Sequence, residues 1–258
     1  MTGVLVLAGV LGLAVGSFLN VVVWRVPRGA SVVAPPSACP RCGARIRPWD
    51  NVPLVSWLVL RGRCRDCAAP ISVRYPVVEA ATGTLFVLTT LRFGVAPELL
   101  AYLYVAAVGI ALALIDLDVH RLPDRIVLPS YGVLAVLLLV GSWGSGDLTA
   151  LGRAAMGGVA LWLLYFLLAL AKPGAMGFGD VKLAGLLGAA LAWVGWGALV
   201  VGAFAAFLLG GLYGVAMMVA GRATRRSRVP FGPWMVLGAF VGVGFGESIW
   251  SAYLGLVL

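Results

Sequence analysis

The chain has 258 residues, of which 62% are hydrophobic and 11% charged, and its mean hydropathy is +1.03. This composition excludes an ordinary water-soluble domain, because soluble domains carry about 25% charged residues. The formal net charge of +9 does not indicate a nucleic acid as a partner, since the cytosolic loops of membrane proteins concentrate Lys and Arg.

Long apolar runs recur along the chain, and a helix that crosses a membrane needs about 20 mostly apolar residues. These runs predict an all-α polytopic membrane protein with about eight transmembrane helices. Seven is the alternative count, because the boundary near Gly195 that divides the run 183–220 into two spans is weak. The expected spans are 3–23, 76–93, 97–115, 127–142, 151–171, 183–195, 197–220 and 233–257. The lipid bilayer is therefore an expected partner.

The basic residues indicate which side of the membrane each loop faces. Nine of the nineteen Lys and Arg residues lie between Arg25 and Arg74, which predicts that this stretch is cytosolic. Strict alternation places three further loops on the same side, 116–126, 172–182 and 221–228, and both termini outside. We expect the first run, 1–23, to stay as an uncleaved helix, because Arg25 and Arg28 follow it instead of preceding it.

All four cysteines fall in one polar segment, as two C-x-x-C pairs: Cys39, Cys42, Cys64 and Cys67. Two pairs at this spacing can close a tetrahedral thiolate site, for which zinc is the usual ion. A rubredoxin-type iron site and a pair of disulfides are the alternatives, although disulfides rarely persist in the cytosol. A segment this short cannot fold by burial alone. We therefore predict a small zinc-ribbon-like insertion of irregular strands and turns with a structural metal.

An acidic residue, Asp116, ends the third expected span within Ile115-Asp-Leu-Asp118. An ionised carboxylate at a membrane boundary is costly, so a carboxylate there is a candidate for function. The alternative is that Asp116, Asp118 and Asp124 only solvate a loop, paired with nearby arginines. The neighbouring His120 is expected to be a solvated boundary histidine. Asp116 differs from the other acids because it belongs to the last turn of the apolar span.

A second acidic site is Gly177-Phe-Gly179-Asp180, which precedes Lys182 and another apolar run. Glycines at alternate positions let the backbone approach another chain, including an extended substrate. The alternative is a flexible loop whose Asp180 caps the next helix. Both acidic sites are predicted on one membrane face, and two carboxylates brought together can share a proton and activate water for peptide hydrolysis.

These motifs together resemble the bifunctional prepilin peptidases, also called type IV leader peptidases or prepilin peptidase/N-methyltransferases, over nearly the whole chain. The residues that carry the resemblance are Gly16–Arg25, the two cysteine pairs, Arg74–Glu79, Ile115–Asp118, Leu122–Asp124, Gly177–Lys182 and Val229–Pro233. The resemblance implies a GxGD-type aspartic protease of the bacterial inner membrane. Such enzymes cut the basic leader from prepilins or pseudopilins after a glycine, at the cytosolic face. They then methylate the new N-terminal amine with S-adenosylmethionine.

Carried over by motif, the resemblance implies that Asp116 and Asp180 are the catalytic pair, with Asp118 as the fallback for the first. It also implies a supporting role for the loop residues Gly177, Gly179 and Lys182. The chain departs from the family at Trp24, at Val119–Arg121 and at Pro173-Gly174. None of these departures touches a proposed catalytic carboxylate.

The site of the methyl donor has no local motif. By resemblance, the segment 24–75 and Glu79 are the nearest candidates. A salt bridge from Glu79 that anchors the cysteine module accounts for this residue equally well. We expect three parts: a first transmembrane helix at 1–23, a cytosolic zinc-binding and methyltransferase-associated module at 24–75, and a membrane-embedded peptidase domain at 76–258.

Two other functions compete with the bifunctional enzyme. One is a peptidase that does not methylate, and the other is a non-enzymatic membrane scaffold whose zinc ribbon binds a partner. The intact cysteine module favours the bifunctional enzyme, because relatives confined to cleavage often lack it. The sequence specifies neither the pilin or pseudopilin that is processed nor the oligomeric state.

Overall fold

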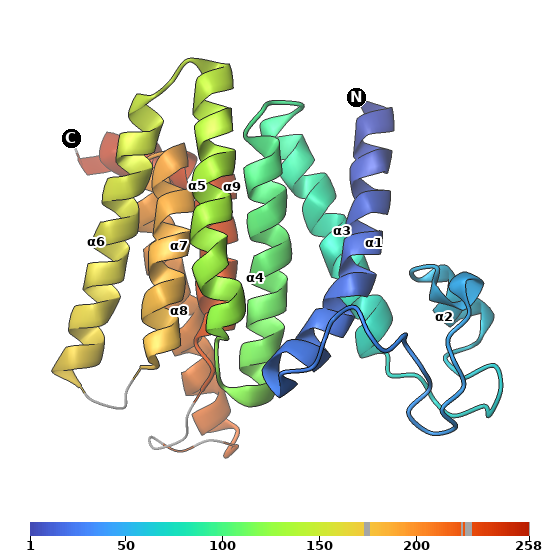
Figure 1. The fold of residues 1–258 in the computed structure, drawn as a ribbon. Helices are drawn as coiled ribbons and strands as arrows, with labels where there is room; N and C mark the ends of the chain where they lie inside the picture. The colour runs from blue at the N-terminus through green and yellow to red at the C-terminus, as the bar shows by residue number, and fades with distance from the viewer. Residues whose placement is uncertain (173–175, 223, 225–228, 258) are drawn as a thin grey trace. The chain divides into compact units, whose positions relative to one another are not determined.

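The computed structural model describes residues 1–172, 176–222, 224 and 229–257 (Figure 1). It divides into two compact units, Met1–Val95 and Ala96–Leu258. Each of the eight apolar runs predicted from the sequence is a helix, so the all-α fold class is confirmed. Pro173 and Gly174, and most of the arginine-rich loop 221–228, lie outside the described residues.

The first unit is built on two long helices, α1 (Thr2–Arg25) and α3 (Arg74–Phe93). Glycines allow their backbones to touch. A Cβ added to Gly12 would lie 2.8 Å from the Cα of Gly83, and one added to Gly16 would lie 2.8 Å from the Cα of Glu79. The Gly12-x-x-x-Gly16 pair is therefore a helix-packing face of the kind that small residues make in membranes.

The cysteine module connects these two helices. It contains the 3₁₀ turns η1 (Val26–Arg28) and η2 (Pro48–Asn51) and the short helix α2 (Val55–Val59). The expected irregular strands are absent from this described segment, which has only two isolated bridges, Ala38 with Arg45 and Arg63 with Pro70. Prolines stand beside or in both bridges (Pro36 and Pro70), and a proline has no N–H to donate to a ladder.

The second unit is a bundle of six helices among its described residues (Figure 1). They are α4 (Leu99–Val119), α5 (Asp124–Ser145), α6 (Thr149–Ala171), α7 (Phe178–Val194), α8 (Trp196–Val219) and α9 (Gly232–Val257). Two pairs pack backbone to backbone. A Cβ added to Gly188 of α7 would lie 2.6 Å from the carbonyl oxygen of Gly157 in α6, and one added to Gly238 of α9 would lie 2.6 Å from that of Gly202 in α8.

The weak boundary near Gly195 is a real helix break. The helix α7 ends at Val194 and α8 begins at Trp196. From α9, Glu247 Oε1 accepts a hydrogen bond at 3.0 Å from the backbone N–H of Ala198. Amides in the first turn of a helix have no partner within the helix, so the carboxylate of the exposed Glu247 satisfies the amide of the buried Ala198.

Six helices in the described part of the chain are long and apolar enough to cross a membrane: Thr2–Arg28, α4, α5, α6, α8 and α9. The sequence predicted about eight, and the two helices outside this set fall short for different reasons. The helix α7 has only 17 residues. The helix α3 contains Arg74, Glu79 and Arg92 together with four threonines, which lower its hydropathy.

Candidate functional site

Asp116 lies in the last turn of α4 and is 5% exposed. Its Oδ2 accepts a hydrogen bond at 2.9 Å from the backbone N–H of Gly232, the first residue of α9. A Cβ added to Gly232 would lie 2.9 Å from the same oxygen. A side chain at this position would force the carboxylate or the start of α9 to shift. The positive N-terminal end of α9 faces the carboxylate.

The chain turns sharply after this carboxylate. The backbone N–H of His120 bonds to the Asp116 carbonyl oxygen at 2.9 Å, and His120 adopts the left-handed conformation that ends α4 (φ 52°). Its side chain is exposed, in agreement with the expected solvated boundary histidine. Asp118, the fallback candidate, is also exposed, whereas Asp116 is buried.

Asp180 lies in the first turn of α7, where its Oδ2 accepts a hydrogen bond at 3.1 Å from the N–H of Gly177. The helix-capping role that the sequence offered as an alternative is therefore present, although the N-cap is Gly177 and Asp180 stands three residues later. This contact uses only one carboxylate oxygen, so Asp180 can cap the helix and also take part in catalysis.

The glycine turn before Asp180 packs on the segment that follows Asp116. A Cβ added to Gly179 would lie 2.9 Å from Leu122 Cβ. Lys182 Nζ lies 2.7 and 2.9 Å from the carboxylate oxygens of Asp124, the first residue of α5. The Tyr131 hydroxyl donates to the Lys182 carbonyl oxygen at 2.5 Å. The start of α7 is thus tied to the loop between α4 and α5.

These contacts bring the two predicted carboxylates to one end of the bundle. They are close enough for the charge of Asp116 to act on Asp180. Two such groups in a poorly solvated site do not both ionise readily, so they tend to share one proton. The arrangement can supply an acid and a base on either side of a peptide bond.

The four cysteine sulfurs of the module all lie within 4.8 Å of one another and could hold a metal ion. The cysteines are free, and Cys39 Sγ lies 3.8 Å from Cys67 Sγ, so the disulfide alternative is wrong. A Zn–S bond of about 2.3 Å in a tetrahedron separates sulfurs by about 3.8 Å. Backbone N–H groups of Cys42 and Arg41 lower the pKa of the Cys39 thiol to about 6. The thiolate form of Cys39 is therefore favoured. The backbone N–H of Ala69 lowers the pKa of the Cys67 thiol, but burial and hydrogen bonds with the other three cysteines outweigh it and raise this pKa to about 12.

Glu79 is 8% exposed on α3, and its Oε2 accepts a hydrogen bond at 2.8 Å from the backbone N–H of Leu54. The sequence offered Glu79 either as a residue of the methyl-donor site or as an anchor for the cysteine module. This hydrogen bond from a backbone amide joins α3 to the module, where the sequence suggested a salt bridge, and the role of Glu79 toward the methyl donor stays a prediction.

Comparison with known proteins agrees with this division of the chain. A model of the bacterial Peptidase A24 N-terminal domain matches residues 10–93, and one of the Type IV leader peptidase family matches residues 103–215. The chain belongs to the type IV leader peptidase family. The boundary between the two compact units, at 95/96, lies in the gap between the two matches, and Asp116 and Asp180 lie in the second match. No solved structure matches the chain.

The chain is also similar to proteins named prepilin leader peptidase/N-methyltransferase. One from Pseudomonas putida is 38% identical, over 97% of this chain and 94% of the relative. Another from Pseudomonas aeruginosa is 38% identical, over 95% of this chain and 91% of the relative. A third from Neisseria gonorrhoeae is 38% identical, over 95% of this chain and 92% of the relative. The family resemblance inferred from the motifs is confirmed. The chain is an enzyme of this class, so the non-enzymatic scaffold is set aside.

One functional contact escaped the sequence analysis. Gly232 belongs to a segment that carried the resemblance, but nothing in its neighbourhood connects it with Asp116, 116 positions earlier. The available signal was a glycine between a phenylalanine and a proline at the start of an apolar run. That pattern indicates a helix start and says nothing about what its amide binds.

Proposed function

We propose that the chain removes the leader peptide from type IV prepilins or pseudopilins and methylates the N-terminus that this cleavage exposes. The observation that carries the peptidase half is the placement of Asp116 and Asp180 at one end of the second unit. That unit holds the match to the leader peptidase family. The methyltransferase half is supported by the match to the N-terminal domain and by the name that the relatives share.

In the proposed reaction the scissile peptide bond lies between the two carboxylates. One carboxylate, ionised, takes a proton from water as the water oxygen attacks the carbonyl carbon. The other, protonated, donates to the carbonyl oxygen. Collapse of the tetrahedral adduct returns a proton to the leaving amine, as in other aspartic dyads. Gly232 acts through Asp116 and is therefore a positioning residue.

The substrate is expected to reach the pair along the glycine turn. The Gly177 backbone is extended (φ −77°, ψ 146°) and exposed. With no side chain at Gly177, an extended substrate can approach the first turn of α7. The apolar helix of the pilin would then pack against the bundle from the lipid while its basic leader stays in water.

For the cysteine module we propose a structural zinc ion held by Cys39, Cys42, Cys64 and Cys67. Four thiolates fill a tetrahedral site and leave no open position for chemistry on the metal. A rubredoxin-type iron would fit the same sulfurs, and metal analysis of the purified protein separates the two. The boundaries 1–23, 24–75 and 76–258 for the three parts likewise remain our prediction.

The six apolar helices support a multi-pass protein of the bacterial inner membrane. We propose that the dyad and the cysteine module face the cytosol and that both termini lie outside. The basic residues between Arg25 and Arg74 support this orientation.

The activity is tested with the full chain purified in detergent and a synthetic prepilin, followed by mass spectrometry. The expected product first loses the leader and then, with S-adenosylmethionine present, gains one methyl group at its N-terminus. Cleavage without methylation would favour the peptidase-only alternative. Absence of both products with a folded protein would contradict the proposal.

A further inference from the structure

One stretch of the cysteine module, residues 51–60, carries no charge and exposes apolar side chains. Its sequence is NVPLVSWLVL, and it contains α2. Val55, Leu58 and Val59 follow helical spacing and are 55%, 66% and 69% exposed. A contiguous apolar patch on the surface of a protein marks contact with another protein or with a membrane. We call these three residues the apolar face of α2, and its position decides between the two partners.

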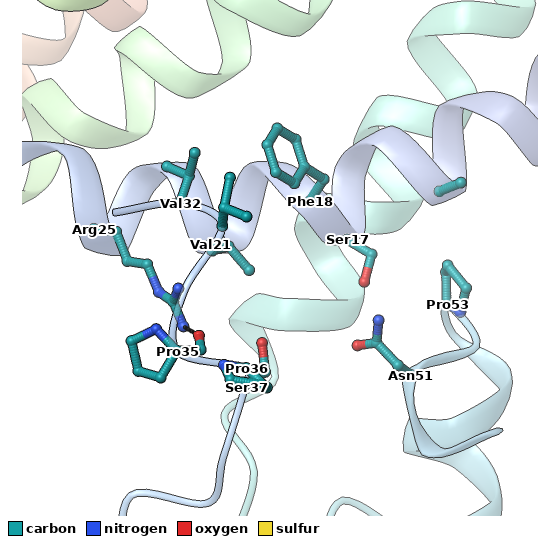
Figure 2. Close-up of a pocket in the computed structure, with 12 residues that line it drawn as sticks. Ser17, Phe18, Val21, Arg25, Val32, Pro35, Pro36, Ser37, Asn51 and Pro53 are labelled. Carbon is teal, nitrogen blue, oxygen red and sulfur yellow. Dashed lines mark hydrogen bonds between the residues drawn. The ribbon is translucent and has the colours of Figure 1, made fainter. Parts of the chain in front are cut away.

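The start of this stretch lies beside the membrane-spanning part of α1. Residues 51–53 line a cavity of about 340 Å³ against α1 together with residues 32–37, and Asn51 points toward Ser17 of α1 (Figure 2). Arg25 is the first charged side chain of the chain, so it marks the level of the membrane surface. Ser17 precedes it by eight residues, which is about 12 Å along a helix. The stretch therefore reaches well into one leaflet, whose hydrocarbon is about 15 Å thick.

The other long helix of the unit gives the same depth. The backbone N–H of Leu54 donates a 2.8 Å hydrogen bond to Glu79 Oε2 of α3. Glu79 lies level with Gly16 of α1, because a Cβ added to Gly16 would lie 2.8 Å from the Glu79 Cα. Figure 1 accordingly shows α2 alongside α1 and α3 and not beyond their ends. A soluble partner cannot reach this level without displacing lipid.

The backbone of this stretch meets the requirement that lipid imposes. In the apolar part of a bilayer, backbone N–H groups need partners within the protein. The Val52 N–H bonds to Ser56 Oγ at 3.0 Å, and the Ser56 hydroxyl donates to the Trp49 carbonyl oxygen at 2.9 Å. The Trp57 indole N–H donates to the Ile71 carbonyl oxygen at 3.2 Å. Further backbone N–H groups with partners inside the protein are those of Leu54, Val55, Ser56, Leu58, Leu60, Arg61 and Gly62. This pairing removes much of the cost of placing the stretch in lipid.

The charges around the stretch suit a surface of anionic lipid. Arg61 and Arg63 follow it closely and are exposed. The acidic residues of the module, Asp50 and Asp66, are both held in ion pairs by other arginines. The charge beside the apolar face is therefore positive, and basic residues at a membrane surface attract anionic headgroups.

We propose that the apolar face of α2 is embedded in the bilayer, in the leaflet at the Arg25 end of α1. Its partner is the acyl chains of the lipid, with anionic headgroups beside Arg61 and Arg63. In the proposed orientation this leaflet is the cytosolic one. The inference rests on α1 crossing the membrane and is independent of the two proposed activities. The cysteine module is then held at the membrane surface by a third attachment, besides its covalent links to α1 and α3.

Site-specific fluorescence quenching of the full chain in nanodiscs tests the proposal. A fluorescent amino acid replaces Leu58, and the quencher is either bromine on the lipid acyl chains or iodide in the water. Brominated lipid should lower the intensity about twofold, since the apolar face of an interfacial helix lies about 5–10 Å into the acyl boundary. Iodide should have little effect. The matched control carries the same amino acid at Arg45, an exposed position of the module outside 51–60, and should show the opposite pattern.

Two results would overturn the proposal. Quenching at Leu58 by iodide and not by brominated lipid would place the apolar face in water. Protection from both quenchers would show that protein covers this face instead of lipid. The same fluorescent amino acid at Val55 gives an independent reading of the same face if the Leu58 variant fails to fold, as judged by its thermal unfolding.

The role of the headgroups is tested by Arg61→Gln/Arg63→Gln in the protein that carries the fluorescent amino acid at Leu58. Quenching by brominated lipid should weaken in nanodiscs that contain anionic lipid and stay unchanged in nanodiscs of neutral lipid alone. An equal response in the two kinds of nanodisc would contradict the attraction of anionic headgroups by these two arginines.

Discussion

The backbone amide of Gly232 donates a 2.9 Å hydrogen bond to Asp116 Oδ2 and so joins the start of α9 to the last turn of α4. The contact orients a buried carboxylate through a backbone N–H. No side-chain substitution elsewhere can supply this donor. It also makes the geometry of the proposed dyad depend on a glycine outside the two acidic motifs.

Substitution of Gly232 by alanine should slow cleavage strongly while the protein still folds. The new Cβ would lie 2.9 Å from Asp116 Oδ2, so the carboxylate or the start of α9 must shift. A displacement of about 1 Å in a catalytic group can cost about a hundredfold in rate. The control is Gly244→Ala in the same helix, where an added Cβ meets nothing within 4 Å. Equal cleavage rates for the two variants would show that the Gly232 contact is dispensable.

The two aspartates should behave as one catalytic unit. Asp116→Asn and Asp180→Asn are each expected to lower kcat about a thousandfold, and the double variant should be scarcely slower than either. Initial rates of prepilin cleavage measure this. The exposed Asp118→Asn serves as the control and should retain most of the activity. An inactive Asp118→Asn beside an active Asp116→Asn would move the first catalytic position to Asp118.

Removal of the metal should unfold the cysteine module and abolish methylation. The double variant Cys39→Ser/Cys42→Ser removes two of four thiolates, and small metal sites of this kind fold only with the ion bound. Metal content by mass spectrometry, proteolysis within 28–75 and methyl transfer are the three readouts. Methyl transfer that continues unchanged in the metal-free variant would separate the module from this activity.

Metal retention should also depend on pH with a definite sign. The pKa of Cys39 is lowered from 9.0 to about 6 by backbone N–H groups. Its thiolate therefore persists in the folded protein at neutral pH, where an unfolded thiol would be protonated. The stabilisation is present above the unfolded pKa and is lost as pH falls through about 6. Release of the ion into a chromogenic chelator, followed from pH 8 to 5 (roughly the range in which such thiols titrate), should increase as the pH falls.

Glu247 should contribute to stability without a role in catalysis. Glu247→Ala leaves the Ala198 amide without its 3.0 Å partner, which should lower the free energy of unfolding by about 1 kcal/mol. Glu247→Gln keeps an oxygen acceptor of the same shape and is the matched control. Unfolding in mixed micelles measures both variants. If the alanine and glutamine variants were equally stable, the capping contact would contribute nothing.

Much of this molecule could be predicted without a structure. The eight helices coincide with the apolar runs, because a segment in lipid must satisfy its backbone groups internally and an apolar run of this length has few alternatives to a helix. The number of membrane-spanning helices was harder to predict than the helices themselves. The 17-residue α7 and the threonine-rich α3 fall below the usual length or hydropathy. The strands expected in the module do not form, because prolines at or beside the two bridges cannot donate to a longer ladder.

The sequence by itself determined the helices, the family and the four-cysteine cluster, since local spacing or hydropathy encodes each of these. Only the tertiary structure decided that Gly232 orients Asp116, that Glu79 holds Leu54, and that α1 and two loops enclose a cavity. Each of these contacts joins residues far apart along the chain. Their formation depends on how close neighbouring backbones come, and no short pattern of side chains encodes that distance.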